Sequence, residues 1–164
     1  MFKLSAEGEA FVKKELERYE TKRSAIIPAL YKVQEENDGW VSEDSIAYLS
    51  QIMDLPEAWI NEVFHFYTMF NKKPAGKLHV QVCANVTCAM FGAREMADAI
   101  CKTFNIKLGE VSEDGNVSVT QVECLGSCDT APMMQVNDRY YENLTNESAI
   151  QTIKDLSHGN KASH

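Results

Sequence analysis

Apolar residues in the first 73 positions recur every three or four residues, which is the spacing of amphipathic helices. This pattern predicts four helices, and residues that favour helix ends mark their limits. These residues are Ser5 as a cap, Asn37-Asp38-Gly39 as a stop, Val41 and Ile46 as a hydrophobic staple, and Pro56 at a helix start. The residues of the fourth helix expected to face inward are Trp59, Ile60, Val63 and Phe64. We therefore expect residues 1–73 to form a helical bundle.

A polar segment, residues 71–77, separates this bundle from a second half with a different pattern. The segment is basic and is broken by Pro and Gly, as expected of a boundary. The elements predicted after it are a strand ending at Cys83, a helix over 96–104, a strand over 117–123, a hairpin over 133–141 and a last helix capped by Thr145. The predicted fold class is therefore α+β or α/β, with a helical bundle over residues 1–73 and a β-α-β-β-α domain over residues 77–158.

The composition and charge limit which partners and which cellular compartment we expect for this chain. The chain has 164 residues and a formal net charge of −8, which argues against a nucleic-acid partner. No apolar run reaches the ~20 residues of a membrane span, and the first residues lack the apolar core of a signal peptide. We expect a cytoplasmic protein, in which thiols stay reduced. Cysteines that lie close together in such a protein are better read as metal ligands than as disulfide partners.

Four of the five cysteines form two close pairs, each placed where a predicted strand runs into a loop. Four residues separate Cys83 from Cys88, and three separate Cys124 from Cys128. Because a strand–helix–strand unit makes its two strands parallel, the loops after them lie at the same edge of the sheet. These four candidate ligand cysteines are therefore expected to converge on one metal site. Cys101 lies on the apolar face of a predicted helix, where we expect a buried core residue.

Two kinds of metal site accept four thiolates. Structural zinc commonly uses C-x₂-C pairs, which this sequence lacks, and the plant-type and bacterial ferredoxin spacings are not matched either. Spacing and topology together favour an iron–sulfur cluster, and zinc remains the alternative. The eight glycines form neither a G-x-G-x-x-G motif nor a P-loop, so no nucleotide cradle is recognisable.

The cysteine pattern, with 35 residues between the two pairs, resembles that of the thioredoxin-like [2Fe–2S] ferredoxins. Within that family the chain is most similar to the small iron–sulfur subunit (the E subunit) in the NADH dehydrogenase module of bacterial respiratory complex I. Asp114, Ser118 and Ala131-Pro132 also stand at the intervals of the family, whereas Val117 takes a position where the family usually has Phe. The resemblance extends to the N-terminal bundle through the segments Ile-Pro-Ala-Leu, Asp-Gly-Trp and Phe-Tyr-Thr-Met-Phe.

The resemblance implies a thioredoxin-like domain that holds one [2Fe–2S] cluster on Cys83, Cys88, Cys124 and Cys128, without a catalytic residue of its own. It implies electron transfer as one subunit of a multisubunit NADH:quinone oxidoreductase. A partner flavoprotein subunit then binds NADH and FMN, and the large iron–sulfur subunit is a further partner. It places the chain at the cytoplasmic face of the membrane, in a peripheral arm and without membrane insertion. The alternatives are the small subunit of an NAD-linked hydrogenase or formate dehydrogenase, a free-standing thioredoxin-like ferredoxin, and a zinc-stabilised interaction module.

Overall fold

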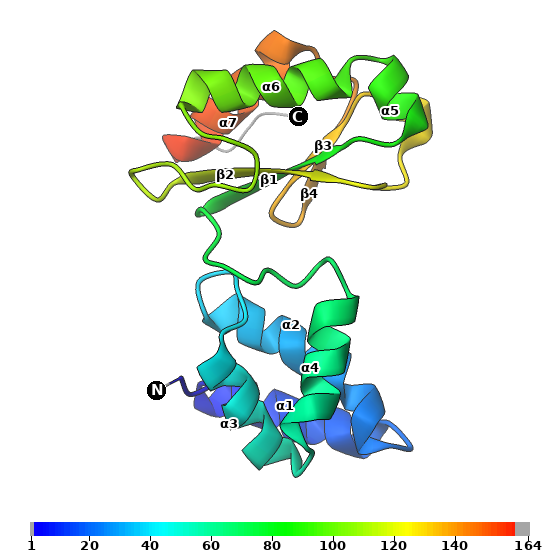
Figure 1. Cartoon of the computed structure of the whole chain (residues 1–164), viewed down its shortest axis with the longest axis vertical. Helices are drawn as coiled ribbons and strands as arrows, with labels where there is room; N and C mark the ends of the chain where they lie inside the picture. The colour runs from blue at the N-terminus through cyan, green and yellow to red at the C-terminus, as the bar shows by residue number, and fades with distance from the viewer. Residues whose placement is uncertain (1, 160–164) are drawn as a thin grey trace. The chain divides into compact units, whose positions relative to one another are not determined.

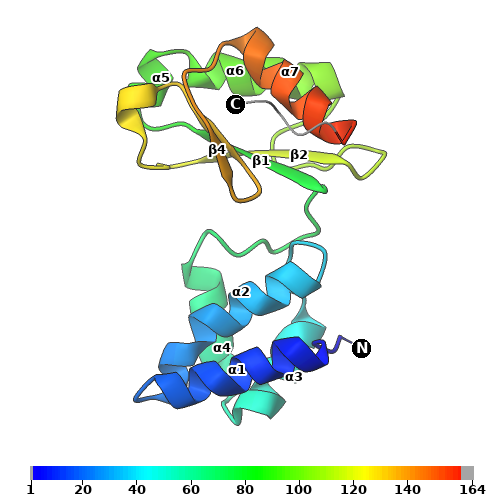
Figure 2. The same ribbon diagram turned by 180° about the vertical axis from the view of Figure 1, so that it is seen from behind.

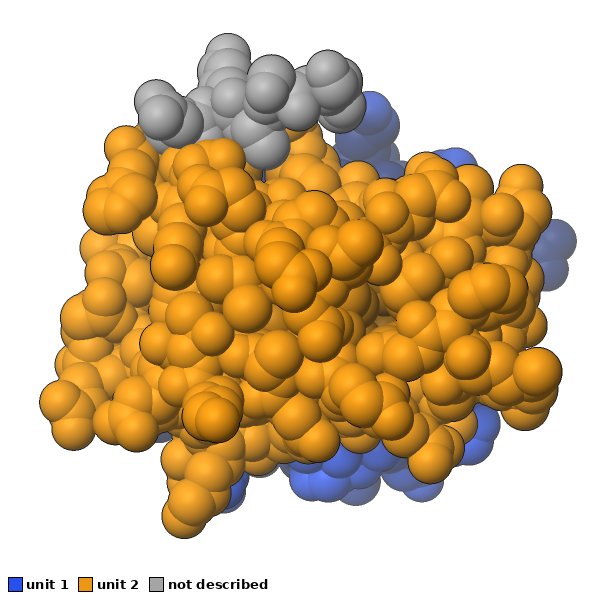
Figure 3. Space-filling view, turned by 90° about the horizontal axis from the view of Figure 1, so that it is seen from above, with its two compact units in different colours: residues 1–74 blue, residues 75–164 orange. Residues whose placement is uncertain are grey.

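The computed structural model describes residues 2–159 and divides the chain into two compact units, Met1–Pro74 and Ala75–His164. Figure 3 colours unit 1 blue and unit 2 orange. Each unit has its own cluster of buried apolar residues, and the two clusters share no residue. The division falls within the polar segment that the sequence marks as a boundary. That residues 1–73 and 77–158 are two separate domains stays a prediction.

Unit 1 consists of helices whose ends are fixed by short polar side chains. Its elements are α1 (Ala6–Arg18), the 3₁₀ turn η1 (Lys22–Ala25), α2 (Ile26–Glu36), α3 (Glu43–Met53) and α4 (Glu57–Phe66), all visible in Figure 1. The Ser5 hydroxyl accepts a hydrogen bond from Gly8 N at 3.0 Å. Ser42 and Ser45 form a reciprocal capping box at the start of α3. The predicted helical bundle and these two helix starts are therefore confirmed.

One inward-facing residue of the fourth helix was predicted wrongly. Trp59 is 40% exposed, whereas Ile60 and Phe64 of the same helix are buried in the core of unit 1. The Arg23 guanidinium lies 5.0 Å from the centre of the Trp59 ring, and Arg23 also pairs with Glu62 one turn further along α4. A cation–π contact at the surface thus takes the place of core packing for this side chain.

Unit 2 contains a mixed sheet in the order β2-β1-β3-β4. Its elements are β1 (Leu78–Cys83), α5 (Val86–Met90), α6 (Ala93–Phe104), β2 (Val117–Val122), the 3₁₀ turn η2 (Cys128–Thr130), β3 (Met134–Val136), β4 (Arg139–Tyr141) and α7 (Asn146–Ser157). β1 pairs with β2 in parallel and with β3 antiparallel, and β3 and β4 form the predicted hairpin. The α+β class and the β-α-β-β-α order are confirmed, with α5 as an additional short helix. The Ala131–Pro132 peptide bond is cis.

The two longer helices of unit 2, α6 and α7, lie on the same face of this sheet in both Figure 1 and Figure 2. The side chains of Val80, Val82 and Val119 are fully buried in the core of this unit. The alternate positions carry polar residues such as Gln81 and Thr120, which pair across β1 and β2. The sheet therefore buries one face and keeps a polar one, as the alternation in the sequence predicts. Among the described residues, no helix is long and apolar enough to cross a membrane.

Candidate metal centre

The parallel pairing of β1 and β2 brings the two cysteine segments to one edge of the sheet. Cys83 is the last residue of β1, and its partner in the register is Val122, the last residue of β2. Cys124 follows two residues after that strand end. In Figures 1 and 2, α5, which contains Cys88, and η2, which begins at Cys128, lie next to each other at the same end of unit 2. The expected convergence of the two segments is therefore present in the backbone.

The first pair of cysteines is buried and hydrogen-bonded. Cys83 is 3% and Cys88 2% exposed. The sequence predicted Cys88 in a loop, but the residue lies in the short helix α5. The Asn85 side chain caps this helix by accepting a hydrogen bond from Val86 N at 2.7 Å. The pKa of Cys88 rises to about 11, mainly because the thiol is buried. A hydrogen bond between the Cys83 and Cys88 thiols raises it further. A hydrogen bond from Met133 N acts in the opposite direction. Cys83 and Cys88 therefore form the buried half of the candidate site, shielded from solvent.

The second pair lies at the surface, with Cys124 in a loop and Cys128 at the start of η2 rather than in the expected loop. Cys124 and Cys128 are both exposed. Gly126, between them, has a φ of +81°, a conformation that favours glycine and turns the loop sharply. The charge of Cys128 raises the pKa of Cys88, so these two thiols lie within electrostatic range of each other. This half of the site is open to solvent and is shaped by backbone conformation rather than by burial.

The four thiols are suitable donors for an iron–sulfur cluster, although they are not arranged around a common point. Cysteine thiolates are the usual ligands of [2Fe–2S] centres, and both Cys83 and Cys128 contribute to the raised pKa of Cys88. Within residues 2–159, however, no three Cys, His, Asp or Glu side chains share a geometry that would hold a metal ion. Because the ligands must lose their protons, uptake of metal at Cys88 also releases a proton.

Cys101 is separate from these four residues in its surroundings. It lies on α6, is 8% exposed and belongs to the core of unit 2 with Ala97 and Ile100. Burial, followed by the nearby charge of Asp98, raises the pKa of the Cys101 thiol. Its predicted burial in the core is confirmed.

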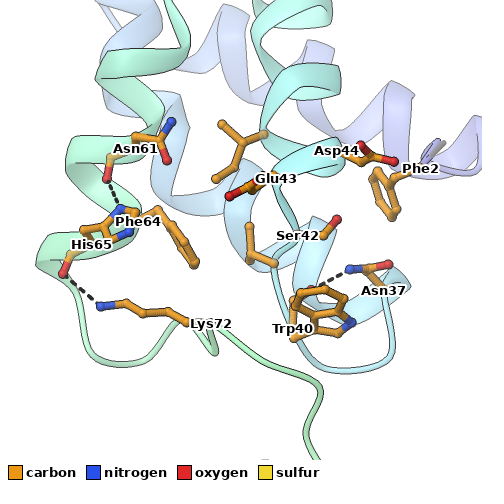
Figure 4. Close-up of a pocket in the computed structure, with 12 residues that line it drawn as sticks. Phe2, Asn37, Trp40, Ser42, Glu43, Asp44, Asn61, Phe64, His65 and Lys72 are labelled. Atoms are coloured by element: carbon orange, nitrogen blue, oxygen red, sulfur yellow. Dashed lines mark hydrogen bonds between the residues drawn. The ribbon is translucent and has the colours of Figure 1, made fainter.

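A cavity of about 810 Å³ lies in unit 1 and contains none of the cysteines. Trp40, Phe64, His65 and Lys72 are among the residues that line it, as Figure 4 shows. Several of its polar groups are already bonded within the unit. The Lys72 ammonium donates to the carbonyl of His65 at 3.5 Å, and the Asn37 amide donates to the carbonyl of Trp40 at 3.0 Å. The cavity therefore adds no chemistry to the cysteine site.

Comparisons with known proteins agree with this geometry. The family model of the thioredoxin-like [2Fe–2S] ferredoxins matches residues 12–157. The chain is 40% identical over 136 residues to the E subunit of NADH-quinone oxidoreductase from Rickettsia felis, a match that covers 83% of this chain and 81% of that protein. It is 43% identical over 137 residues to the protein of the same name from Rickettsia bellii, covering 84% and 82% of the two chains.

Among solved structures, a chain of an NAD⁺-reducing [NiFe]-hydrogenase in the air-oxidised state is similar with a TM-score of 0.67 and 22% identity. The match covers 80% of this chain and 23% of the hydrogenase chain, so this protein spans about a quarter of that one, and the likeness concerns the fold alone. The match of the family model over most of the chain, together with the two relatives at 40% and 43% identity, establishes the family. The chain belongs to the thioredoxin-like [2Fe–2S] ferredoxin family.

Proposed function

We propose that this chain is the small iron–sulfur subunit of an NADH:quinone oxidoreductase, with one [2Fe–2S] cluster bound by Cys83, Cys88, Cys124 and Cys128. The observation that carries the proposal is the position of both cysteine segments at the carboxyl ends of one parallel strand pair. Two relatives at 40% and 43% identity, both named as the E subunit of NADH-quinone oxidoreductase, support the choice of complex. When bound, a [2Fe–2S] cluster supplies one-electron transfer.

The chain's own residues have a limited task in this reaction. Cys83 and Cys88 hold their sulfurs in a dry pocket, and Cys124 and Cys128 hold theirs on a loop near the solvent. NADH releases a hydride, which carries two electrons, so a flavin has to stand between NADH and a one-electron centre. We assign NADH and FMN to a partner flavoprotein subunit and a further contact to the large iron–sulfur subunit. The complex would lie at the cytoplasmic face of the membrane, and this chain would not be catalytic alone.

Metal analysis of the chain tests the site. Protein purified under anaerobic conditions is expected to be red-brown and to contain about two iron and two acid-labile sulfide per chain. A colourless protein with one zinc per chain would instead identify the zinc-stabilised interaction module.

Co-expression tests the role. With the flavoprotein encoded beside it, the chain is expected to form a stable complex in which NADH reduces FMN, whereas the isolated chain does not oxidise NADH. Failure to associate with that flavoprotein would favour a free-standing ferredoxin. A complex that also contains a hydrogenase or formate dehydrogenase subunit would identify the related NAD-linked enzymes.

A further inference from the structure

An acidic side chain outside the cysteine segments holds the second cysteine loop in place. Glu142 lies in the connection between β4 and α7. One oxygen of its carboxylate, Oε1, accepts hydrogen bonds from the hydroxyls of Ser127 and Thr130, the latter at 2.7 Å. The two hydroxyl oxygens themselves lie 2.8 Å apart. Ser127 directly precedes Cys128, and Thr130 follows it at the end of η2. Glu142 is therefore hydrogen-bonded to residues on both sides of Cys128 in the sequence.

Strand β4 and the connection after it are attached to the loop at two other points. The Tyr140 hydroxyl donates to the carbonyl of Leu125 at 2.7 Å. Asn143 N donates to the carbonyl of Thr130 at 2.8 Å. Segment 140–143 therefore supports the loop from outside, and Glu142 is its charged member. The hydrogen bonds from Ser127 and then Thr130 lower the pKa of Glu142, so the carboxylate remains ionised near neutral pH.

We propose that Glu142 is a positioning residue that holds the Cys124–Cys128 loop and lowers the reduction potential of the cluster. The inference rests on the proposed function, because it requires a cluster on the four candidate ligand cysteines. Reduction adds one negative charge to the cluster, and a fixed negative charge beside the loop opposes that step. Hydrogen bonds to cluster sulfurs also tune the potential. Because the Ser127 hydroxyl has a single hydrogen and donates it to Glu142, that hydrogen is not free to bond a cluster sulfur.

The loop offers a matched control at Asp129. Asp129 is also acidic and exposed, and it directly follows Cys128. Among residues 2–159, however, no hydrogen bond or ion pair fixes its carboxylate. If the fixed position of Glu142 matters, Glu142→Gln has a larger effect than Asp129→Asn. If any nearby charge is equivalent, the two effects are equal.

The test is the reduction potential of the cluster-loaded protein, followed by electron paramagnetic resonance during a redox titration. Glu142→Gln is expected to retain the cluster and to increase the reduced-to-oxidised ratio at a fixed potential about two- to fivefold, which is a positive shift of about 20–40 mV. Because Glu142 is exposed, the shift is expected to shrink as salt is added. An unchanged potential in Glu142→Gln, or an equal shift in Asp129→Asn, would overturn the proposal.

Thr130→Val provides a second test if Glu142→Gln does not retain its cluster. This variant removes one of the two hydroxyls that hold the carboxylate, so the charge remains but is less firmly fixed beside the loop, and a smaller positive shift is expected. An unchanged potential in Thr130→Val would then show that fixing the Glu142 carboxylate does not set the potential, which overturns the proposal. Absence of iron and sulfide from the unaltered protein would be a different result, since it would refute the proposed function itself.

Discussion

Gly76 occupies a position where even one methyl group meets the backbone of another strand. It is buried just before β1, and its N–H donates to the Ser118 hydroxyl at 3.0 Å. A Cβ added at this residue would lie 2.6 Å from both Ser118 N and Val117 C, whereas an ordinary van der Waals contact measures 3.4–4 Å. Neither atom belongs to a flexible side chain, so the strand itself has to move. We therefore predict that Gly76→Ala destabilises unit 2.

The size of the loss follows from three terms. Overpacking a tight site costs about 1–3 kcal/mol. Separating the two segments also weakens the bond from Gly76 N to Ser118, which contributes about 0.5–1.5 kcal/mol. The lower entropy of alanine in the unfolded chain offsets about 0.4–1 kcal/mol. The free energy of unfolding of unit 2 is therefore expected to fall by about 2 kcal/mol.

The chain supplies separate optical signals for this measurement. Both tryptophans, Trp40 and Trp59, lie in unit 1, so their fluorescence reports on that unit during unfolding by urea. The visible absorbance of the bound cluster reports on unit 2, and its midpoint is the quantity expected to fall. The control is Gly109→Ala, where φ is +82° and no atom lies within 4 Å of the added Cβ. Its backbone strain is expected to cost only ~1 kcal/mol. A Gly76→Ala protein at least as stable as the unaltered one would refute the reasoning.

The remaining predictions concern ligands, caps and pH. Replacing any candidate ligand cysteine by Ser is expected to abolish cluster binding, whereas Cys101→Ala keeps the iron content; iron loss in a folded Cys101→Ala would show a wrong ligand assignment. Ser42→Ala removes the cap of α3 and is expected to lower the stability of unit 1 by about 1 kcal/mol, seen in tryptophan fluorescence. Thr145→Ala, at the α7 cap, is the matched change in unit 2. Burial lowers the pKa of His79, so the unfolded chain takes up its proton first as the pH falls. Stability of unit 2 is therefore expected to decrease below about pH 6.5, and an unchanged pH slope in His79→Gln would contradict this origin.

The sequence predicted the meeting of the cysteine segments because two strong rules act together. Alternating valines identify β1 and β2, and a helical crossover between two strands makes them parallel. The short helix α5 could not be predicted in the same way, since five residues are too few to display a helical period. It is this turn that buries Cys88, and so the contrast between a dry and an exposed pair of thiols was not predicted either.

Contacts between surface side chains of different elements could not be predicted from the sequence either. Glu142 reaches Ser127 across 15 positions because the hairpin of β3 and β4 folds back on the loop. Trp59 occupies an apolar position of the helical pattern, yet the cation of Arg23 from another element holds it at the surface. Local periodicity identifies a face of a helix, but it does not state which neighbour will cover that face.

The register between β1 and β2 has a consequence for the candidate metal site. Leu78 pairs with Val117, 39 positions away, and the pairing continues in step to Cys83 and Val122. A slip by one residue would turn every side chain of β1 to the opposite face, including the Cys83 thiol. A substitution far from the cysteines that shifts this register would therefore remove Cys83 from the site as surely as replacing the cysteine itself.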